Sequence, residues 1–251
     1  MNIKKILIIS LFLLILTSIV IDASYAVSSE KIKISYSKLT DTFDKKIASI
    51  DEILTWPKKN YYTEYSYKVN IKKANQNKYK IQSVKCKYNF YDDITDKYNI
   101  IYKTYNGKNK TSLNIKQSDD YSLESVTINY QTKSEIKKES MNIRFYNGKV
   151  TKVTYDSQGI GKKSKITVKE KGYYLTNGQG IPVITNIKFN IKTTNKKYKI
   201  KTIQLIYQNT DDKVSKTTTY NGNGKTTFTK TIKGEFVVVE HRLAEFKITY
   251  Y

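Results

Sequence analysis

Apolar and polar residues alternate with a period of two over most of the chain after Tyr61. The first such run places apolar side chains at four alternate positions, Tyr65, Tyr67, Val69 and Ile71. Because successive side chains of a strand point to opposite faces of a sheet, this rhythm is typical of strands with one buried face. A shorter run of the same kind begins at Ile32. The sequence therefore predicts a mainly β fold.

Three segments share a longer pattern, in which a tyrosine is followed by apolar residues 2, 5, 7 and 9 positions later. The segments are Tyr79, Ile81, Val84, Cys86 and Tyr88; Tyr121, Leu123, Val126, Ile128 and Tyr130; and Tyr198, Ile200, Ile203, Leu205 and Tyr207. The step of three within a two-residue rhythm predicts a bulge or a short break in each strand.

Each of these segments leads to an Asn-Gly pair, at 106–107, 147–148 and 221–222. Asn and Gly accept the positive φ angles of tight hairpin turns, so each pair predicts a hairpin. We therefore predict three repeated strand-hairpin units over residues 79–107, 121–148 and 198–222. Residues 155–159 (Tyr-Asp-Ser-Gln-Gly) predict a further turn.

Residues 39–54 follow a different rhythm, with apolar side chains separated by steps of four, four, three and four: Leu39, Phe43, Ile47, Ile50 and Leu54. Such steps place all five on one face of a helix. Asp41 and Asp44 would then lie in the first turn, where carboxylates interact favourably with the helix dipole, and Pro57 would end the helix. We predict one N-terminal amphipathic helix over 38–54, packed on a single antiparallel meander sheet that is open, curved or a half-barrel.

The first 26 residues have the layout of a secretory signal peptide. Lys4 and Lys5 precede an apolar run from Ile6 to Ile21, and Ala-Ser-Tyr-Ala ends the segment at residue 26. The alternative is an uncleaved membrane anchor, because the run is intermediate in length between a signal core and a transmembrane helix. Under both readings residues 27–251 form a single β-rich domain that lies outside the cytoplasm or at the cell surface.

The formal net charge of +23 at pH 7 points to an anionic partner. Lysine supplies nearly all of the basic residues, since Arg144 and Arg242 are the only arginines. Sequence-specific reading of nucleic acid relies on the arginine fork, so we expect no specific nucleic-acid partner. An anionic cell-wall glycan or membrane surface fits better. Codon bias in an AT-rich genome is an alternative source of the lysines.

Catalytic and metal-binding residue types are scarce, because the chain has one histidine, His241, and one cysteine, Cys86. Cys86 stands where its sister segments have Ile128 and Leu205, which predicts a small buried hydrophobic residue. We expect His241 to be a hydrogen-bonded residue at a strand end. We expect no catalytic, cofactor or metal site.

Acidic residues leave two alternatives open. The pairs at 92–93, 119–120 and 211–212 predict turn residues rather than calcium ligands, because one pair supplies too few oxygen atoms for a calcium ion. A carboxylate-dependent hydrolase could use acids such as Glu124, Glu235 or Glu240, but no spacing favours any two of them.

The Tyr-Asn-Gly-Lys turns resemble those of YD-repeat and MORN-type β-hairpin arrays, over about five residues per turn. The order of one helix and then a long meander resembles the half-barrel of periplasmic lipoprotein carriers. That second resemblance implies a helix in the concave face of the sheet, with space for acyl chains between them. The sequence thus predicts a secreted or cell-surface non-enzymatic binding or structural protein, with a carrier of an apolar or lipid ligand as the alternative.

Overall fold

The computed structural model describes residues 27–57, 64–117, 121–143, 152–175 and 180–251, and the expected signal segment 1–26 lies outside them. The fold is mainly β, as the alternation predicts. Its strands are β1 (Ser28–Lys33), β2 (Ser35–Asp44), β3 (Ala48–Thr55), β4 (Glu64–Ile71), β5 (Lys80–Asp92), β6 (Lys97–Lys110), β7 (Ser112–Lys116), β8 (Ser122–Gln131), β9 (Ile136–Asn142), β10 (Lys152–Ile160), β11 (Ser164–Leu175), β12 (Ile181–Thr193), β13 (Ile200–Gln208), β14 (Val214–Lys225), β15 (Thr227–Val237) and β16 (Arg242–Tyr250).

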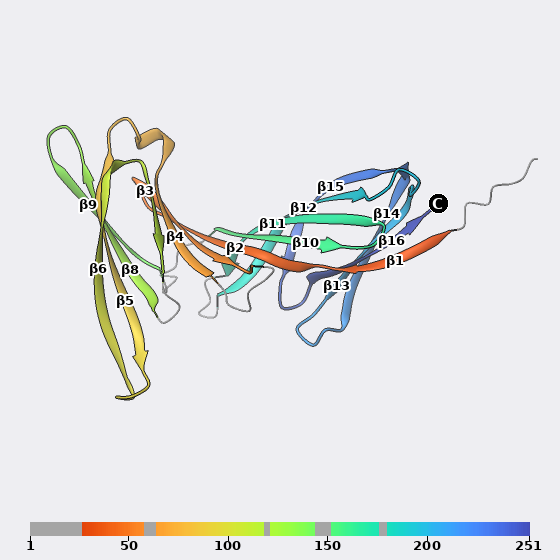
Figure 1. The fold of residues 1–251 in the computed structure, drawn as a ribbon, viewed down its shortest axis with the longest axis horizontal. Coiled ribbons are helices and arrows are strands. Elements are labelled where there is room, and N and C mark those ends of the chain that lie inside the picture. Colours follow the sequence, from red (N-terminus) through yellow and green to blue (C-terminus); the bar gives the residue numbers. More distant parts are fainter. Residues whose placement is uncertain (1–26, 58–63, 118–120, 144–151, 176–179) are drawn as a thin grey trace, which may run out of the picture.

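The strands form three antiparallel sheets, not the single sheet that we expected. One has the order β1-β16-β13-β14 and another the order β6-β5-β8-β9. Between them runs an eight-stranded sheet, the central sheet, with the order β15-β12-β11-β10-β2-β3-β4-β7. Figure 1 shows the result as an elongated molecule with one small sheet at each end of the central one.

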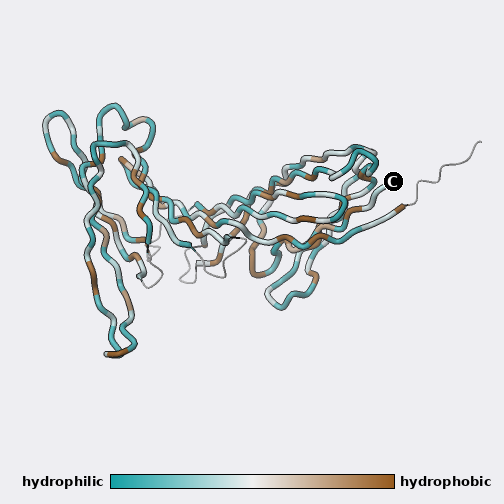
Figure 2. Tube along the Cα trace, viewed as in Figure 1, coloured by the Kyte–Doolittle hydropathy of each residue, from teal (hydrophilic) through white to brown (hydrophobic). Residues whose placement is uncertain are grey.

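The two halves of the molecule follow the same strand order. In each half four strands of the central sheet face a four-stranded sheet, and the halves meet where β2 pairs with β10. Each half has its own core of buried side chains, one over residues 43–143 and the other formed by Ile32 and residues 153–250. Figure 2 shows the alternation of hydrophobic and hydrophilic residues along the strands that supply these cores.

Two carboxylates make equivalent contacts in the two halves. Glu139 on β9 accepts backbone hydrogen bonds from the turn between β2 and β3, and one from the Tyr130 hydroxyl at 2.9 Å. Glu30 on β1 does the same for the turn between β10 and β11 and for the Tyr250 hydroxyl, at 2.8 Å. The N-terminal strand β1 therefore completes the C-terminal half.

The predicted helix over residues 38–54 is wrong, because this segment forms the hairpin of β2 and β3. A hairpin gives the same apolar spacing. Steps of four are even, so Leu39 and Phe43 share one face of β2, and their cross-strand partners are Leu54 and Ile50. Threonine favours strands, and Thr42 donates a hydrogen bond across the hairpin to Asp51 at 2.9 Å. The described residues contain one 3₁₀ turn, Lys73–Asn75, and no α-helix.

The three segments with shared spacing form β5, β8 and β13, and each contains the predicted bulge. The pairing of β5 shifts between Ile81 and Ser83, and that of β13 shifts between Ile200 and Thr202. In β8 the pairing skips Glu124. In all three strands the irregularity lies at the step of three, where an extra residue is accommodated. The origin of these segments as repeated units stays a prediction.

The hairpin turns predicted at the Asn-Gly pairs are wrong at two positions, and the third, 147–148, lies outside the described residues. Asn106-Gly107 and Asn221-Gly222 lie inside β6 and β14, opposite the bulges. A Cβ atom on Gly107 would lie 2.2 Å from the carbonyl oxygen of Ile81, so glycine is needed for close backbone approach. Positive φ angles follow immediately, and the chain crosses into the central sheet as β7 or β15.

The turn predicted at residues 155–159 is also wrong, because these residues lie within β10. The strand contains a register shift against β2 between Asp156 and Ser157. Gly159 packs against β1, where an added Cβ atom would lie 2.7 Å from Ile32. The turn-forming residues thus mark a bulge and a close packing contact.

Candidate functional site

The outer surface of the central sheet in the C-terminal half carries a grid of polar side chains, which we call the lysine face. Alternation along each strand produces it: on β11 the residues Ile166, Val168 and Glu170 point into the core, and their neighbours point outward. The outward positions are Thr154, Asp156, Gln158 and Ile160 on β10; Lys165, Thr167, Lys169 and Lys171 on β11; Asn186, Lys188, Asn190 and Lys192 on β12; and Thr227, Thr229, Thr231 and Lys233 on β15.

The charge of the lysine face is strongly unbalanced. It holds six lysines and one acid, Asp156, which forms an ion pair with Lys169 at 3.4 Å. Among the described residues no acidic partner lies within ion-pair distance of the other five lysines. The face therefore presents a net formal charge of +5 to solvent.

Two pairs of lysines stand directly opposite each other on neighbouring strands, Lys165 with Lys192 and Lys169 with Lys188. Like charges at directly opposed positions destabilise a sheet by up to about 1 kcal/mol per pair. The two pairs are four residues apart along the strands, or about 13 Å at a rise of about 3.3 Å per residue. Asp156 partly neutralises Lys169, so the repulsion is greatest between Lys165 and Lys192, where a bound anion would remove it.

A hollow of about 410 Å³ lies on the part of the lysine face nearest β2, from which Ser37 also lines it. It is lined by outward side chains from β10, β11 and β12, among them Asp156, Lys169, Lys188 and Asn190. Thr229 donates a hydrogen bond to Asn190 at 3.0 Å, which orients that amide. The hollow thus combines cations with fixed hydrogen-bonding groups.

The corresponding surface of the N-terminal half is electrically balanced. Its outward positions hold equal numbers of lysines and acids, namely Lys38, Lys68 and Lys116 against Asp44, Asp51 and Glu64, and Lys68 stands directly opposite Asp51. The Asp51 carboxylate accepts hydrogen bonds from Thr42 at 2.9 Å and Asn70 at 3.1 Å. Among the outward positions of the central sheet, the excess of lysine over acid therefore lies in the C-terminal half.

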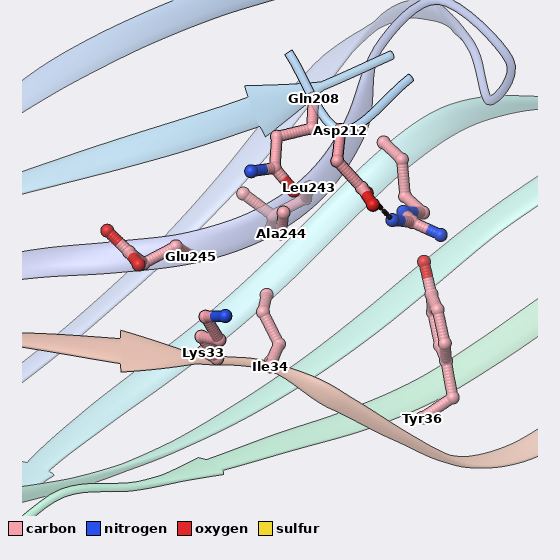
Figure 3. Close-up of a pocket in the computed structure, with 9 residues that line it drawn as sticks. Lys33, Ile34, Tyr36, Gln208, Asp212, Leu243, Ala244 and Glu245 are labelled. Atoms are coloured by element: carbon pink, nitrogen blue, oxygen red, sulfur yellow. Dashed lines mark hydrogen bonds and ion pairs between the residues drawn. The ribbon is translucent and has the colours of Figure 1, made fainter. Parts of the chain in front are cut away.

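A second candidate site is the pocket of about 380 Å³ beside Arg242, which we call the Arg242 pocket. It lies where the chain passes from β1 to β2 and so from an outer sheet to the central sheet. Figure 3 shows Lys33, Ile34 and Tyr36 on one wall, with Gln208, Asp212, Leu243 and Ala244 opposite them. Arg242 forms an ion pair with Asp212 at 3.0 Å.

Two acids are buried near the junction of the halves. Burial raises the pKa of Glu170, which is 5% exposed, to about 7. Its charge in turn contributes to raising the pKa values of Tyr36 and Tyr207, although burial is the larger cause for both tyrosines. Burial, with a contribution from Glu52, also raises the pKa of Asp41 to about 7, against the opposing hydrogen bond from Tyr174.

The single cysteine and the single histidine lie in different halves of the molecule. Cys86 is fully buried in the N-terminal core, and burial raises the pKa of its thiol to about 11. The Nδ1 atom of His241 lies 3.0 Å from the Ser215 hydroxyl, one residue before β16 begins. The two are therefore in separate halves of the molecule and form no common site.

The acidic pairs and candidate acids are also dispersed. Asp92 accepts backbone hydrogen bonds within the β5–β6 turn, and Asp212 lies in the β13–β14 turn with a φ of 58°; the pair 119–120 lies outside the described residues. Glu124 forms an ion pair with Lys87 on β5, at 2.6 Å, whereas Glu235 and Glu240 lie on and after β15. Among the described residues no group of three potential metal ligands comes together.

The β5–β6 hairpin carries a further exposed feature, a set of apolar side chains on and beside its turn. Ile94 at the turn is 95% exposed and Tyr98 is 75% exposed. Figure 2 shows the hydrophobic tip of this hairpin at one end of the molecule. In the described part of the chain, no helix is long and apolar enough to cross a membrane.

Neither the residues of the lysine face nor the Arg242 pocket was predicted from the sequence. The lysine face has a sequence signal, since lysine and threonine occupy alternate positions from Lys165 to Lys171 and lysine recurs at Lys188 and Lys192. The pocket has no local signal, because its walls come from residues 33–36, 208–212 and 242–245.

No family model matches the chain, and no curated protein matches it. Among solved structures the chain is similar to a protein named pT26-6p, with 9% sequence identity and a TM-score of 0.19. The match covers 88% of this chain and 65% of that protein, so the chain spans less than two thirds of its length. At this TM-score the likeness carries no argument about fold or function.

Proposed function

We propose that the protein is an exported, non-enzymatic binding protein that contacts an anionic envelope polymer through the lysine face. The observation that carries the proposal is the direct opposition of Lys165 with Lys192 and of Lys169 with Lys188. Like-charge pairs on one sheet reduce the stability of the fold; Asp156 offsets part of that cost at Lys169, and a polyanion that bridges the lysines offsets the rest. Export rests on the signal-like layout of residues 1–26.

The geometry of the lysine face supports a linear polymer over a compact anion. Its lysines extend over four neighbouring strands, and strands are about 4.8 Å apart. A flexible chain of negative charges can contact several of these lysines at once and release its counterions. Threonine and asparagine side chains between the lysines offer hydrogen bonds to sugar hydroxyl or phosphate oxygen atoms.

The alternative function, a carrier of an apolar or lipid ligand, rested on the helix predicted over residues 38–54. That function needed a helix over a concave sheet, and residues 39–54 form β2 and β3 instead. The binding protein is therefore the function that we propose.

The proposal is tested by affinity for immobilised polyphosphate and polygalacturonate, which present phosphate and carboxylate charges on a linear chain. We expect the protein to bind at low salt and the double variant Lys169→Gln/Lys188→Gln to bind about 30-fold more weakly. This loss follows from about 1 kcal/mol for each lysine near an anionic surface.

The matched control is Lys68→Gln/Lys116→Gln, which removes the same charge from the balanced N-terminal half of the same sheet. We expect its affinity to change less than about threefold, because screening weakens the effect of distant exposed charges. Equal losses of affinity in the two double variants would show that binding depends only on the net charge of the protein. That result would overturn the assignment of binding to the lysine face. Absence of binding at low salt would overturn the proposed function.

A further inference from the structure

The outer sheet of the N-terminal half has an open edge at β6. This strand stands at one end of the order β6-β5-β8-β9, and among the described residues it pairs with β5 alone. The opposite side of a strand of 14 residues therefore presents a row of backbone N–H and C=O groups to a further strand. Figure 1 shows the hairpin of β5 and β6 projecting from one end of the molecule, away from the central sheet.

Residues 98–102 of this edge, Tyr-Asn-Ile-Ile-Tyr, carry no charge, and four of the five favour strand structure. Tyr98, Ile100 and Tyr102 point away from the core and are 75%, 54% and 57% exposed. Edge strands are usually protected from pairing by charged side chains, by proline or by a bulge. An uncharged edge with exposed aromatic and aliphatic side chains is suited to accept another strand.

The equivalent edge strand of the C-terminal half, β14, shows that the fold does not require this composition. The sheet β14-β13-β16-β1 has the same order, and Tyr105 and Tyr220 begin the Tyr-Asn-Gly sequences that lie opposite the two bulges. Counted back from these tyrosines, the equivalents of residues 98–102 are residues 213–217, Lys-Val-Ser-Lys-Thr. Two lysines thus protect that edge, whereas apolar residues occupy the edge of β6.

We propose that β6 pairs antiparallel with β6 of a second copy of the chain, so that two outer sheets of four strands form one sheet of eight. The fold already joins equivalent strands in this way, because β2 and β10 hold the same place in the two halves and pair antiparallel. The proposal goes beyond binding of an anionic polymer. It uses the other half of the molecule and no residue of the lysine face.

Charge selects the register of the two β6 strands. A two-fold axis at Ile101 places this residue opposite itself and Ile100 opposite Tyr102 of the second copy, so apolar side chains meet on both faces. An axis at Ile100 instead places Lys97 opposite Lys103 of the second copy, and this happens twice. Like charges at directly opposed positions destabilise a sheet, so we expect the register centred on Ile101.

Sedimentation of the purified protein over a range of concentrations measures the association. We expect a monomer–dimer equilibrium whose dissociation constant falls severalfold between about 0.1 M and about 1 M salt, because salt screens the repulsion between two copies of equal net charge. Contacts between lysines and a polyanion weaken with salt, so the two kinds of association respond in opposite directions. A protein that stays monomeric at every concentration and salt level, or a dimer that weakens with salt, would overturn the proposal.

Two variants that add the same charge test the edge. We expect Ile100→Lys on β6 to raise the dissociation constant of the dimer at least about tenfold, because a lysine at this edge opposes strand pairing. Thr217→Lys, at an exposed position of the equivalent strand β14, is the matched control and should change the constant by less than about threefold. Unchanged circular dichroism shows that each variant is folded, and equal effects of the two variants would overturn the proposal.

Cysteine variants test the register. Ile101→Cys brings two thiols to directly opposed positions, at a separation that a disulfide can span, whereas Asn99→Cys leaves them about 13 Å apart along the strands. We therefore expect mild oxidation to link Ile101→Cys into a covalent dimer and to leave Asn99→Cys unlinked, while Cys86 is fully buried. Faster linkage of Asn99→Cys than of Ile101→Cys would overturn the proposed pairing.

Discussion

Replacing Glu170 with glutamine removes a carboxylate that the core of the C-terminal half has to bury. Glu170 lies on the inward face of β11, in line with Ile166 and Val168, and is 5% exposed. No hydrogen bond or ion pair to its carboxylate is found among the described residues, and burial is the cause that raises its pKa. The folded state therefore disfavours the ionised form of this side chain.

The magnitude follows from the pKa, which burial raises from 4.5 to about 7. The carboxyl is protonated in both the folded and unfolded states below pH 4.5, so it imposes no ionisation cost there. As the pH rises through 7, the unfolded state is already ionised and the folded state resists ionisation. The cost reaches about 3 kcal/mol above pH 7, because one pKa unit corresponds to about 1.4 kcal/mol.

The assay is urea unfolding of the wild-type protein and Glu170→Gln at pH 5 and pH 8. We expect the free energy of unfolding of the wild type to fall by up to about 3 kcal/mol more than that of Glu170→Gln between these pH values. Asp93→Asn, at an exposed turn residue, is the control and should follow the wild type. Equal pH dependence in the wild type and Glu170→Gln would refute the assignment of this cost to Glu170.

Two further predictions concern packing. Gly222→Ala would place a Cβ atom 2.4 Å from the Ile200 carbonyl oxygen, so we expect a loss of about 1–3 kcal/mol in urea unfolding. Thr219→Ala, at an exposed position of the same strand, should change stability by less than about 0.5 kcal/mol, and equal effects would contradict the close approach. Cys86 should react with a thiol reagent only after unfolding, and rapid labelling of the native protein would contradict its burial.

The strands were predictable because a period of two is a direct consequence of strand geometry. A fourth segment with the same offsets was overlooked, since His241 replaces the first tyrosine before Leu243, Phe246, Ile248 and Tyr250. Its strand, β16, pairs with β13 and skips Ala244, as β8 pairs with β5 and skips Glu124. The apolar spacing was therefore a better guide to this strand than the identity of the leading residue.

The errors have a common physical origin in local patterns that fit two structures. The apolar spacing at Leu39, Phe43, Ile50 and Leu54 fits one face of a helix. It fits equally well one face of a two-stranded hairpin, and only the pairing of that hairpin with β10 and β4 decides between the two structures. Likewise glycine permits both a tight turn and a close backbone contact, and at Gly107 the contact with Ile81 decides.

The candidate sites were less predictable than the strands. Lys169 and Lys188 are opposite each other only because β11 and β12 pair in one particular register, and a shift of one residue would turn each lysine to the other face. The Arg242 pocket brings together residues more than 170 positions apart, and nothing local to Tyr36 or Arg242 indicates that they line one pocket.

The most direct test of the lysine face is the salt dependence of polyphosphate binding. The affinity of a polyanion falls with salt in proportion to the number of lysines that contact it, with a slope of roughly 0.7–0.9 per contact in nucleic acids. Removing Lys169 and Lys188 should therefore lower the slope by about 1.5, and removing Lys68 and Lys116 should leave it unchanged. An unchanged slope in Lys169→Gln/Lys188→Gln would contradict a polymer seated on this face.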